Sequence, residues 1–194
     1  MPCSVTTLGV LGLFCGSAFA GEIWNEQTQG DLSDARLSPS AFTLASGGNT
    51  LVGVLEGFRE TGEPDLDYFS ITIPEGFLLN GITLDAYQST DFVAFIGIVP
   101  GTTFPFDPAS VNAEDLFGYA LFGPFDVGGD LLAAMSQNGA GFTAPLPAGT
   151  YTFWAQQLGE RTDYTATFQV AAVPSPGTLA LLAVTAGACA RRRR

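Results

Sequence analysis

The strict two-residue alternation of residues 65–74 is the feature of this sequence that most constrains its fold. One side of the alternation carries Phe69, Ile71 and Ile73, and the other side carries Tyr68, Ser70 and Thr72. A period of two predicts a β-strand with one buried face. We expect the strand to end at Pro74, because proline has no N–H to donate to a strand ladder.

Segments of the same kind recur along the chain. We expect further strands at residues 41–45, 49–55, 80–88, 92–99, 119–122, 131–135, 151–157 and 164–170. The nearly all-apolar segment 92–99 is expected to be a central strand, and the last two segments are expected to form a hairpin-like pair around Gly159. One helical turn is expected near residues 109–115. Several short strands without a long amphipathic helix predict an all-β antiparallel sandwich.

Histidine and lysine are absent from the 194 residues, which excludes most enzyme chemistry. Without histidine there is no Ser-His-Asp or Cys-His arrangement, and without lysine there is no Schiff base. Zinc sites take cysteine or histidine ligands, which residues 21–172 lack. We therefore expect a protein that is not an enzyme, and the remaining catalytic alternative is a hydrolase that uses two carboxylates.

The body of the chain is strongly acidic. Residues 21–172 carry 19 acidic side chains against three arginines, a net charge of −16. Such a surface repels nucleic acid and anionic lipid, so we expect no nucleic-acid partner. It is compatible with divalent cations and with solubility outside the cell.

The first 20 residues have the pattern of a secretory signal peptide. An apolar region at residues 8–14 is followed by Ala18 and Ala20, small residues at the positions that signal peptidase requires before Gly21. The alternative is an uncleaved N-terminal anchor. The three cysteines, Cys3, Cys15 and Cys189, lie in terminal segments, so we expect no disulfide in the mature body.

The last 22 residues have the order of a C-terminal sorting signal. A joint of Val173, Pro174, Ser175 and Pro176 leads into an apolar run at residues 177–190, and the chain then ends on Arg191, Arg192, Arg193 and Arg194. Fourteen residues make a helix of roughly 21 Å, shorter than the bilayer core of about 30 Å. We therefore expect transient membrane insertion, followed by cleavage, with the arginines on the cytoplasmic side. The alternative is a plain tail anchor.

The joint, apolar run and arginine cluster together resemble the tails of PEP-CTERM proteins. Ser175 stands where the glutamate of the usual VPEP joint would be. The resemblance implies processing by an exosortase-type protease. It also implies a final place at the surface, or in the extracellular matrix, of a bacterium that makes exopolysaccharide.

The body resembles the bacterial pre-peptidase C-terminal domain. The segments that carry the likeness are DLSDARLSP, GGNTLVGVLE, DLDYFSITIPEG, LPAGTYTFWAQQLG and TDYTATFQV. The resemblance covers roughly residues 31–170 and implies a jelly-roll-like β-sandwich. The expected organisation is a signal helix (1–20), an acidic arm (21–40), the sandwich (41–171) and the sorting tail with its short hydrophobic helix (172–194).

Two acidic clusters suggest a calcium site. One cluster lies in the arm, at Asn25, Glu26, Asp31 and Asp34, and the other precedes the alternating strand, at Glu63, Asp65 and Asp67. Calcium takes six to eight oxygen ligands, mostly from carboxylates and carbonyls. Collagen-binding relatives of this domain bind calcium where an acidic arm meets the sandwich, so the resemblance implies Asp31, Asp34, Asp65 and Asp67 as ligands. The alternative is that these are solvated loop carboxylates.

Trp154 is the candidate ligand-facing aromatic, because alternation places it opposite Tyr151 and Phe153. The alternative is that the arm or a second layer covers it. The sequence thus predicts an exported, non-enzymatic surface or matrix protein. A calcium-dependent carbohydrate- or protein-binding module is the second candidate, and a carboxylate-based hydrolase is the third.

Overall fold

Strand β4 (Leu66–Gln88) dominates the computed structural model, which describes residues 21–58, 62 and 65–174 of the chain. Its first half pairs with β7 (Leu146–Gln156), and its second half pairs with β8 (Thr162–Ala172). The prediction that Pro74 ends the strand was wrong. The ladder with β7 is interrupted between Ile73 and Leu78, so Pro74 lies where β7 requires no donor.

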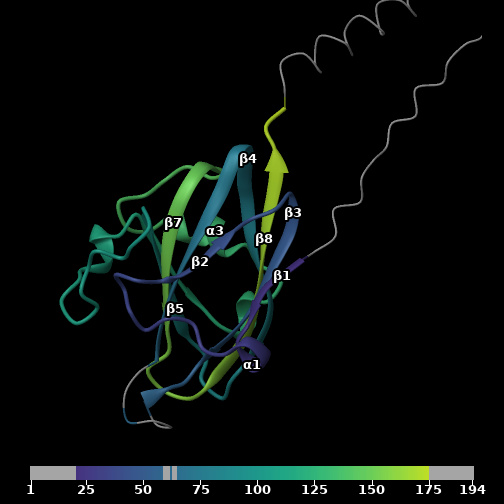
Figure 1. Ribbon diagram of the computed structural model, residues 1–194. Coiled ribbons are helices and arrows are strands. Elements are labelled where there is room, and N and C mark those ends of the chain that lie inside the picture. The colour runs from purple at the N-terminus through teal and green to yellow at the C-terminus, as the bar shows by residue number, and fades with distance from the viewer. Residues whose placement is uncertain (1–20, 59–61, 63–64, 175–194) are drawn as a thin grey trace, which may run out of the picture.

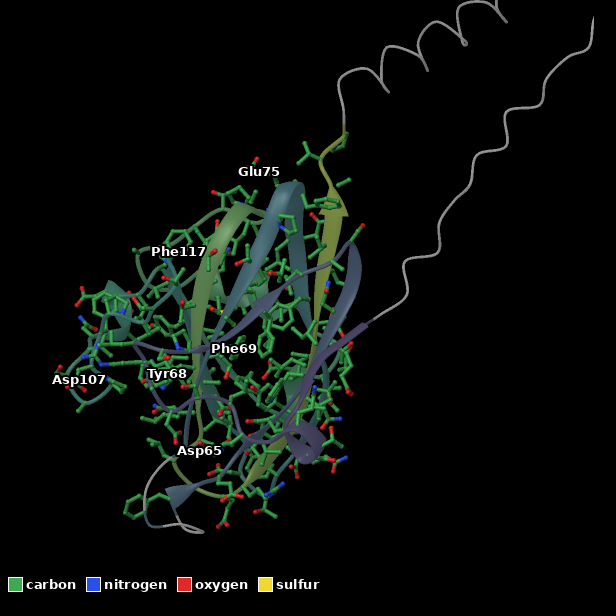
Figure 2. All side chains as sticks on the ribbon, in the orientation of Figure 1. Asp65, Tyr68, Phe69, Glu75, Asp107 and Phe117 are labelled. Atoms are coloured by element: carbon green, nitrogen blue, oxygen red, sulfur yellow. The ribbon has the colours of Figure 1, made fainter. Side chains whose placement is uncertain are left out.

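The chain runs along β4 in one direction and then returns. Figure 2 shows Asp65 at one end of the molecule and Glu75 at the other. Leu66 pairs with the last residue of β7, whereas Gln88 pairs with Asp163 near the start of β8. The bend around Glu75 therefore carries the strand from one part of the sheet to another.

The strands form one open, mixed sheet of eight strands, in the order β1-β3-β8-β4-β7-β5-β6, with β2 paired to β4 (Figure 1). The remaining strands are β1 (Gly21–Asn25), β2 (Ser40–Thr43), β3 (Gly47–Leu55), β5 (Ala94–Pro100) and β6 (Gly118–Phe122). The β-rich class predicted from the sequence is confirmed. The pairs β1–β3 and β2–β4 are parallel, so the sheet is not wholly antiparallel as expected.

The predicted hairpin of the last two strands is also wrong. Strands β7 and β8 follow each other in the chain, but β4 lies between them in the sheet. Because β4 bends, its first half takes β7 as a neighbour and its second half takes β8. The alternation of β7 and β8 identified them as strands but carried no information about their partners.

Residues 131–135 form helix α3 (Leu131–Met135) instead of the expected strand. The Asp130 carboxylate caps this helix by accepting the N–H groups of Leu132 and Ala133. The helix buries Leu131, Leu132 and Met135. The segment is apolar enough to be a buried strand or a buried helix, and the Asp130 cap favours the helix. Other helical turns among the described residues include α1 (Glu26–Gln29), η1 (Ala113–Asp115) and η2 (Pro124–Asp126).

The main core is built on aromatic rings, some from paired strands and some from strands far apart in the sheet order. Phe69 of β4 stacks on Phe153 of β7, with centroids 5.0 Å apart, and also contacts Phe168 of β8 at 6.2 Å. Phe122 of β6, at one end of the sheet order, contacts Tyr164 of β8 at 5.8 Å. The sheet therefore curves until its distant strands meet across one core.

Among the described residues, no helix has the length and apolar character needed to cross a membrane. The expected signal segment (1–20) and the apolar run with its arginines (177–194) lie outside those residues. Of the expected sorting joint, the structure describes Val173 and Pro174. The Val173 N–H donates to the Gly76 carbonyl at 2.8 Å, which holds the end of β8 against the bend of β4.

Candidate metal centre

Five carboxylates from the arm and from the start of β4 meet at one end of the sheet. Oxygens of Glu26, Asp31 and Asp67 lie within 4.8 Å of one another, and so do oxygens of Asp31, Asp34 and Asp65. Asp31 belongs to both groups. The structure thus brings together all four residues that the sequence suggested, and adds Glu26 from the arm cluster.

The arm reaches β4 because its first residues join the sheet. Strand β1 runs parallel to β3, and Asn25 then caps α1 by accepting the N–H of Gln27 at 3.1 Å. The indole N–H of Trp24 donates to the Gly30 carbonyl at 3.0 Å, and its ring contacts Phe42 of β2. These contacts fix the turn that presents the arm carboxylates.

Glu26 connects the arm to β3. Its two oxygens accept the backbone N–H groups of Leu32, at 2.5 Å, and of Val54. Burial and, to a smaller extent, the neighbouring Asp31 raise the pKa of Glu26 from 4.5 to about 8, against the opposing effect of these two donors. Glu26 therefore holds a proton at neutral pH unless a cation replaces it.

Asp67 forms the floor of the cluster, and its position is anomalous. Its register partners across β7, β5 and β6 are Ala155, Ile96 and Ala120, all apolar and buried. The Asp67 side chain is 0% exposed, and neither carboxylate oxygen has a hydrogen-bond partner in the described structure. Burial, together with the charge of Glu26, raises its pKa well above the ordinary value.

Asp65 and the arm form the mouth of the cluster. Asp65 is half-buried and accepts the Glu56 N–H at 2.9 Å, and burial raises its pKa to about 6. Asp31 and Asp34 are exposed. The cluster is therefore open to solvent on the arm side and closed at Asp67, which is the geometry that admits a small ion.

Tyr164 of β8 adds a further polar atom near this end of the core. Its hydroxyl is buried and has no partner within the described residues. Burial, and next the charge of Asp67, raise the pKa of this phenol. The ring lies against Gly53 of β3, where any side chain would collide with it. The sequence did not connect Tyr164 with the carboxylates, because alternation along a strand does not show what a side chain faces.

Trp154 does not present a ligand-facing surface. It lies on the face opposite Phe153, as alternation predicted, but only 3% of it is exposed. Tyr68, Phe95 and Phe104 pack around its ring. The segment 101–117 supplies Phe104 and Leu116 to this second, outer cluster. Trp154 is therefore not a ligand-facing aromatic, and the alternative that another segment covers it holds, although the covering segment is 101–117.

The ligand atoms gathered at the cluster are all carboxylate oxygens, which are the ligands of hard cations such as calcium and magnesium. Nitrogen and sulfur ligands, which zinc prefers, do not occur in these two groups. The site therefore supports cation binding by oxygen. Comparisons with protein-family models, with curated proteins and with solved structures found no match for this chain.

Proposed function

We propose that this chain is an exported, non-enzymatic protein of the cell surface or extracellular matrix, in which calcium ties the acidic arm to a jelly-roll-like β-sandwich. The observation that carries the proposal is the Asp67 carboxylate, fully buried and without a partner. A buried carboxylate must be protonated or paired with a positive charge. Calcium supplies that charge from the side that Asp31 and Asp34 leave open.

Calcium suits the cluster better than magnesium. Five carboxylates offer up to ten oxygens around two groups that share Asp31. Calcium accepts six to eight oxygens in flexible geometry, whereas magnesium requires a near-ideal octahedron and retains several waters. Because the five ionised carboxylates carry five negative charges, we expect each group to take one ion at saturation.

The support for a sandwich comes from contacts across the core. Rings of β6 and β8 meet, and so do rings of the first half of β4 and of β8. Two parts of one curved sheet that pack their inner sides on a common apolar interior would make a sandwich, which supports this part of the proposal. The bend of β4 at Glu75 serves as its corner.

The carboxylate arrangement favours an ion over a hydrolase. Glycosidases hold their two carboxyl groups about 5 to 9.5 Å apart on either side of a sugar. Here the oxygens within each group lie inside 4.8 Å, and Asp67 is closed to solvent. The buried Asp67 carboxyl cannot contact a substrate ring.

Thermal unfolding of the purified chain tests the calcium proposal. Melts are compared in EDTA, in millimolar calcium and in millimolar magnesium. Binding to the folded state alone stabilises it by RT ln(1 + [L]/Kd), about 2.7 kcal/mol at 100 times Kd. We expect calcium to raise the Tm, magnesium to raise it less, and Asp31→Asn to remove the calcium effect. An equal Tm in EDTA and in calcium contradicts the proposal.

Mass spectrometry of the native protein tests the sorting proposal separately. We expect the mature chain to begin at Gly21 and to lack the arginine cluster. Recovery of the mature protein with an intact C-terminal tail contradicts exosortase-type processing.

A further inference from the structure

The outer face of strands β5, β6 and β7 has one covered row of side chains and one open row. The covered row consists of Tyr68, Trp154, Gly97 and Tyr119, which are register partners across four strands. The open row lies two residues further along each strand, on the same face of the sheet. It consists of Leu66, Gln156, Phe95 and Leu121, which are also register partners. Segment 101–117 buries Tyr68 and Trp154 of the covered row, whereas Leu66, Phe95 and Gln156 of the open row stay half-buried and Leu121 is exposed.

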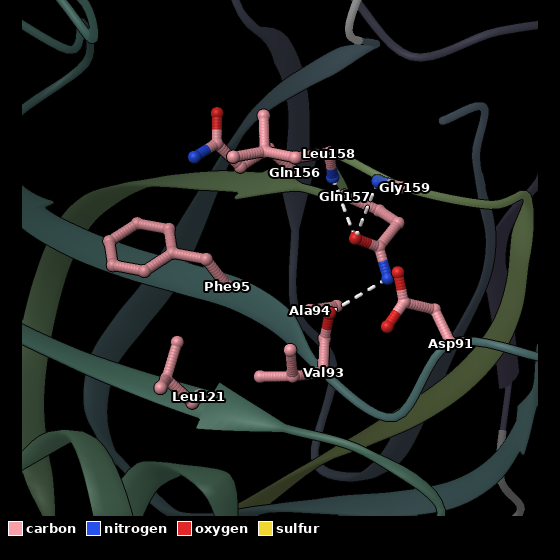
Figure 3. A pocket seen from close by; sticks show the side chains of 9 residues that line it. All are labelled: Asp91, Val93, Ala94, Phe95, Leu121, Gln156, Gln157, Leu158 and Gly159. Carbon is pink, nitrogen blue, oxygen red and sulfur yellow. Dashed lines mark hydrogen bonds between the residues drawn. The ribbon is translucent and has the colours of Figure 1, made fainter. Parts of the chain in front are cut away.

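A groove of about 460 Å³ lies over this open row (Figure 3). Its floor is the ring of Phe95, which Figure 3 shows between Leu121 and Gln156. Val93 and Leu158 flank it, and Asp91 lies at one end. We call this hollow the outer groove. Its volume is within the range of small-molecule sites, and it lies on the outward face, whereas Asp67 points into the core.

The outer groove is preformed. Gln157 is buried, and its amide nitrogen donates to the Val93 carbonyl at 2.7 Å. Its amide oxygen accepts the N–H groups of Leu158, at 2.6 Å, and Gly159, at 3.1 Å. One side chain therefore joins the start of β5 to the end of β7. A binding site whose walls are fixed in advance loses less entropy when a ligand binds.

The floor combines an aromatic surface with a free amide. The Phe95 ring is held from below by Trp154, at 4.8 Å, and stacks with Tyr119, at 6.0 Å. Beside it, the half-buried amide of Gln156 has no hydrogen-bond partner among the described residues. An aromatic face stacks on an apolar ligand surface, and an adjacent amide donates and accepts hydrogen bonds. A sugar ring has both features, because its C–H face is apolar and its rim carries hydroxyls.

Charge narrows the class of ligand. The lining of the outer groove contains no cationic side chain and one carboxylate, Asp91, within a body of net charge −16. An anionic polymer is therefore repelled. Aliphatic side chains alone would suit an apolar peptide or a second copy of the chain, but they give no role to the unpaired Gln156 amide.

We propose that the outer groove binds a neutral saccharide chain. Phe95 stacks on the C–H face of one sugar ring, and Gln156 hydrogen-bonds to its hydroxyls. One oxygen of Asp91 accepts the Phe92 N–H, and its other oxygen accepts a hydrogen bond from a further sugar hydroxyl. This site is separate from the proposed calcium site and does not depend on it.

Titration calorimetry of the full chain with β-linked neutral hexasaccharides of glucose and xylose tests the proposal, with polygalacturonate as the anionic probe. We expect binding of a neutral probe and none of the anionic one. Phe95→Leu retains apolar volume without the ring, and it should weaken binding about tenfold. Gln156→Ala should weaken it about threefold to tenfold. Phe125→Ala, an exposed aromatic outside the groove, is the matched control and should leave affinity unchanged.

Two results overturn the proposal. One is that the chain binds none of the neutral probes although its cooperative thermal unfolding shows that it is folded. The other is self-association of the chain, measured by sedimentation at rising protein concentration, that Leu121→Ser abolishes. Such a result would assign the outer groove to a second copy of the chain. Running each titration in EDTA and in calcium keeps the two sites distinct, since loss of the calcium effect leaves saccharide binding measurable.

Discussion

Asp130 and Asp67 both lie where a distant segment closes on β4, but their surroundings are opposite. Asp130 is exposed, and one of its oxygens accepts three backbone N–H groups, from Ile82 of β4 and from Leu132 and Ala133 of α3. Asp67 is fully buried and accepts none. The charge of Asp130 is satisfied by backbone hydrogen bonds within the fold. The charge of Asp67 has no such partner, so it must be neutralised by a proton or a cation.

Replacing Asp67 should separate these two roles most strongly. Asp67→Asn retains the shape but removes the charge that a cation neutralises. We expect the stabilisation by calcium, about 2.7 kcal/mol at 100 times Kd, to be lost, while stability in EDTA is retained or increased. Urea unfolding with and without calcium measures both quantities. A variant that still gains the full calcium stabilisation would show that Asp67 is not a ligand.

A change of pH should also have a large effect on stability. Burial raises the pKa of Glu26 to about 8 and that of Asp65 to about 6. Without calcium, the folded state therefore holds protons that the unfolded state releases, and stability should fall as pH rises from about 4.5 to 8. Calcium must displace those protons, so its affinity should rise with pH, by about tenfold per unit for the Glu26 proton alone. Tm profiles across this range test both signs, and an EDTA profile that rises with pH is the contrary result.

Replacing Asp130 should cost less and should not depend on calcium. Asp130→Ala removes the cap of α3 and the contact to Ile82. Loss of a helix cap costs about 1 kcal/mol, in a range of roughly 0.5 to 2. We expect the same loss of unfolding free energy in EDTA and in calcium. A loss that differs between EDTA and calcium would show that Asp130 is coupled to the carboxylate cluster, which contradicts the contrast drawn between Asp130 and Asp67.

The smallest effect on stability is expected at the mouth of the cluster. Asp34 is exposed, so Asp34→Asn should change unfolding in EDTA by less than about 0.5 kcal/mol. Its loss as a ligand should nevertheless weaken calcium binding by about tenfold, which calorimetry can measure directly. Unchanged calcium affinity would show that Asp34 is not a ligand. The group of Glu26, Asp31 and Asp67 would then be the remaining candidate site.

Local patterns determined much of this protein. The alternation of residues 66–73 correctly placed Phe69 in the core, and the alternation of β7 placed Trp154 on the opposite face. The acidic arm and the residues before β4 were recognised as two parts of one candidate site, and they do meet. The strand predictions were confirmed because strand periodicity is a property of short segments. The role of the carboxylates as ligands stays a proposal.

Tertiary structure alone decided partners and covering. The bend around Glu75 separated β7 from β8, and the cap at Asp130 stabilised a helix in an apolar segment. Segment 101–117 buried Trp154 and left Phe95 half-buried. Alternation says that a residue faces one side, but which segment lies on that side depends on contacts between residues far apart in the chain. For the same reason the sequence showed that Asp67 is acidic, and only the folded sheet showed that it is buried without a partner.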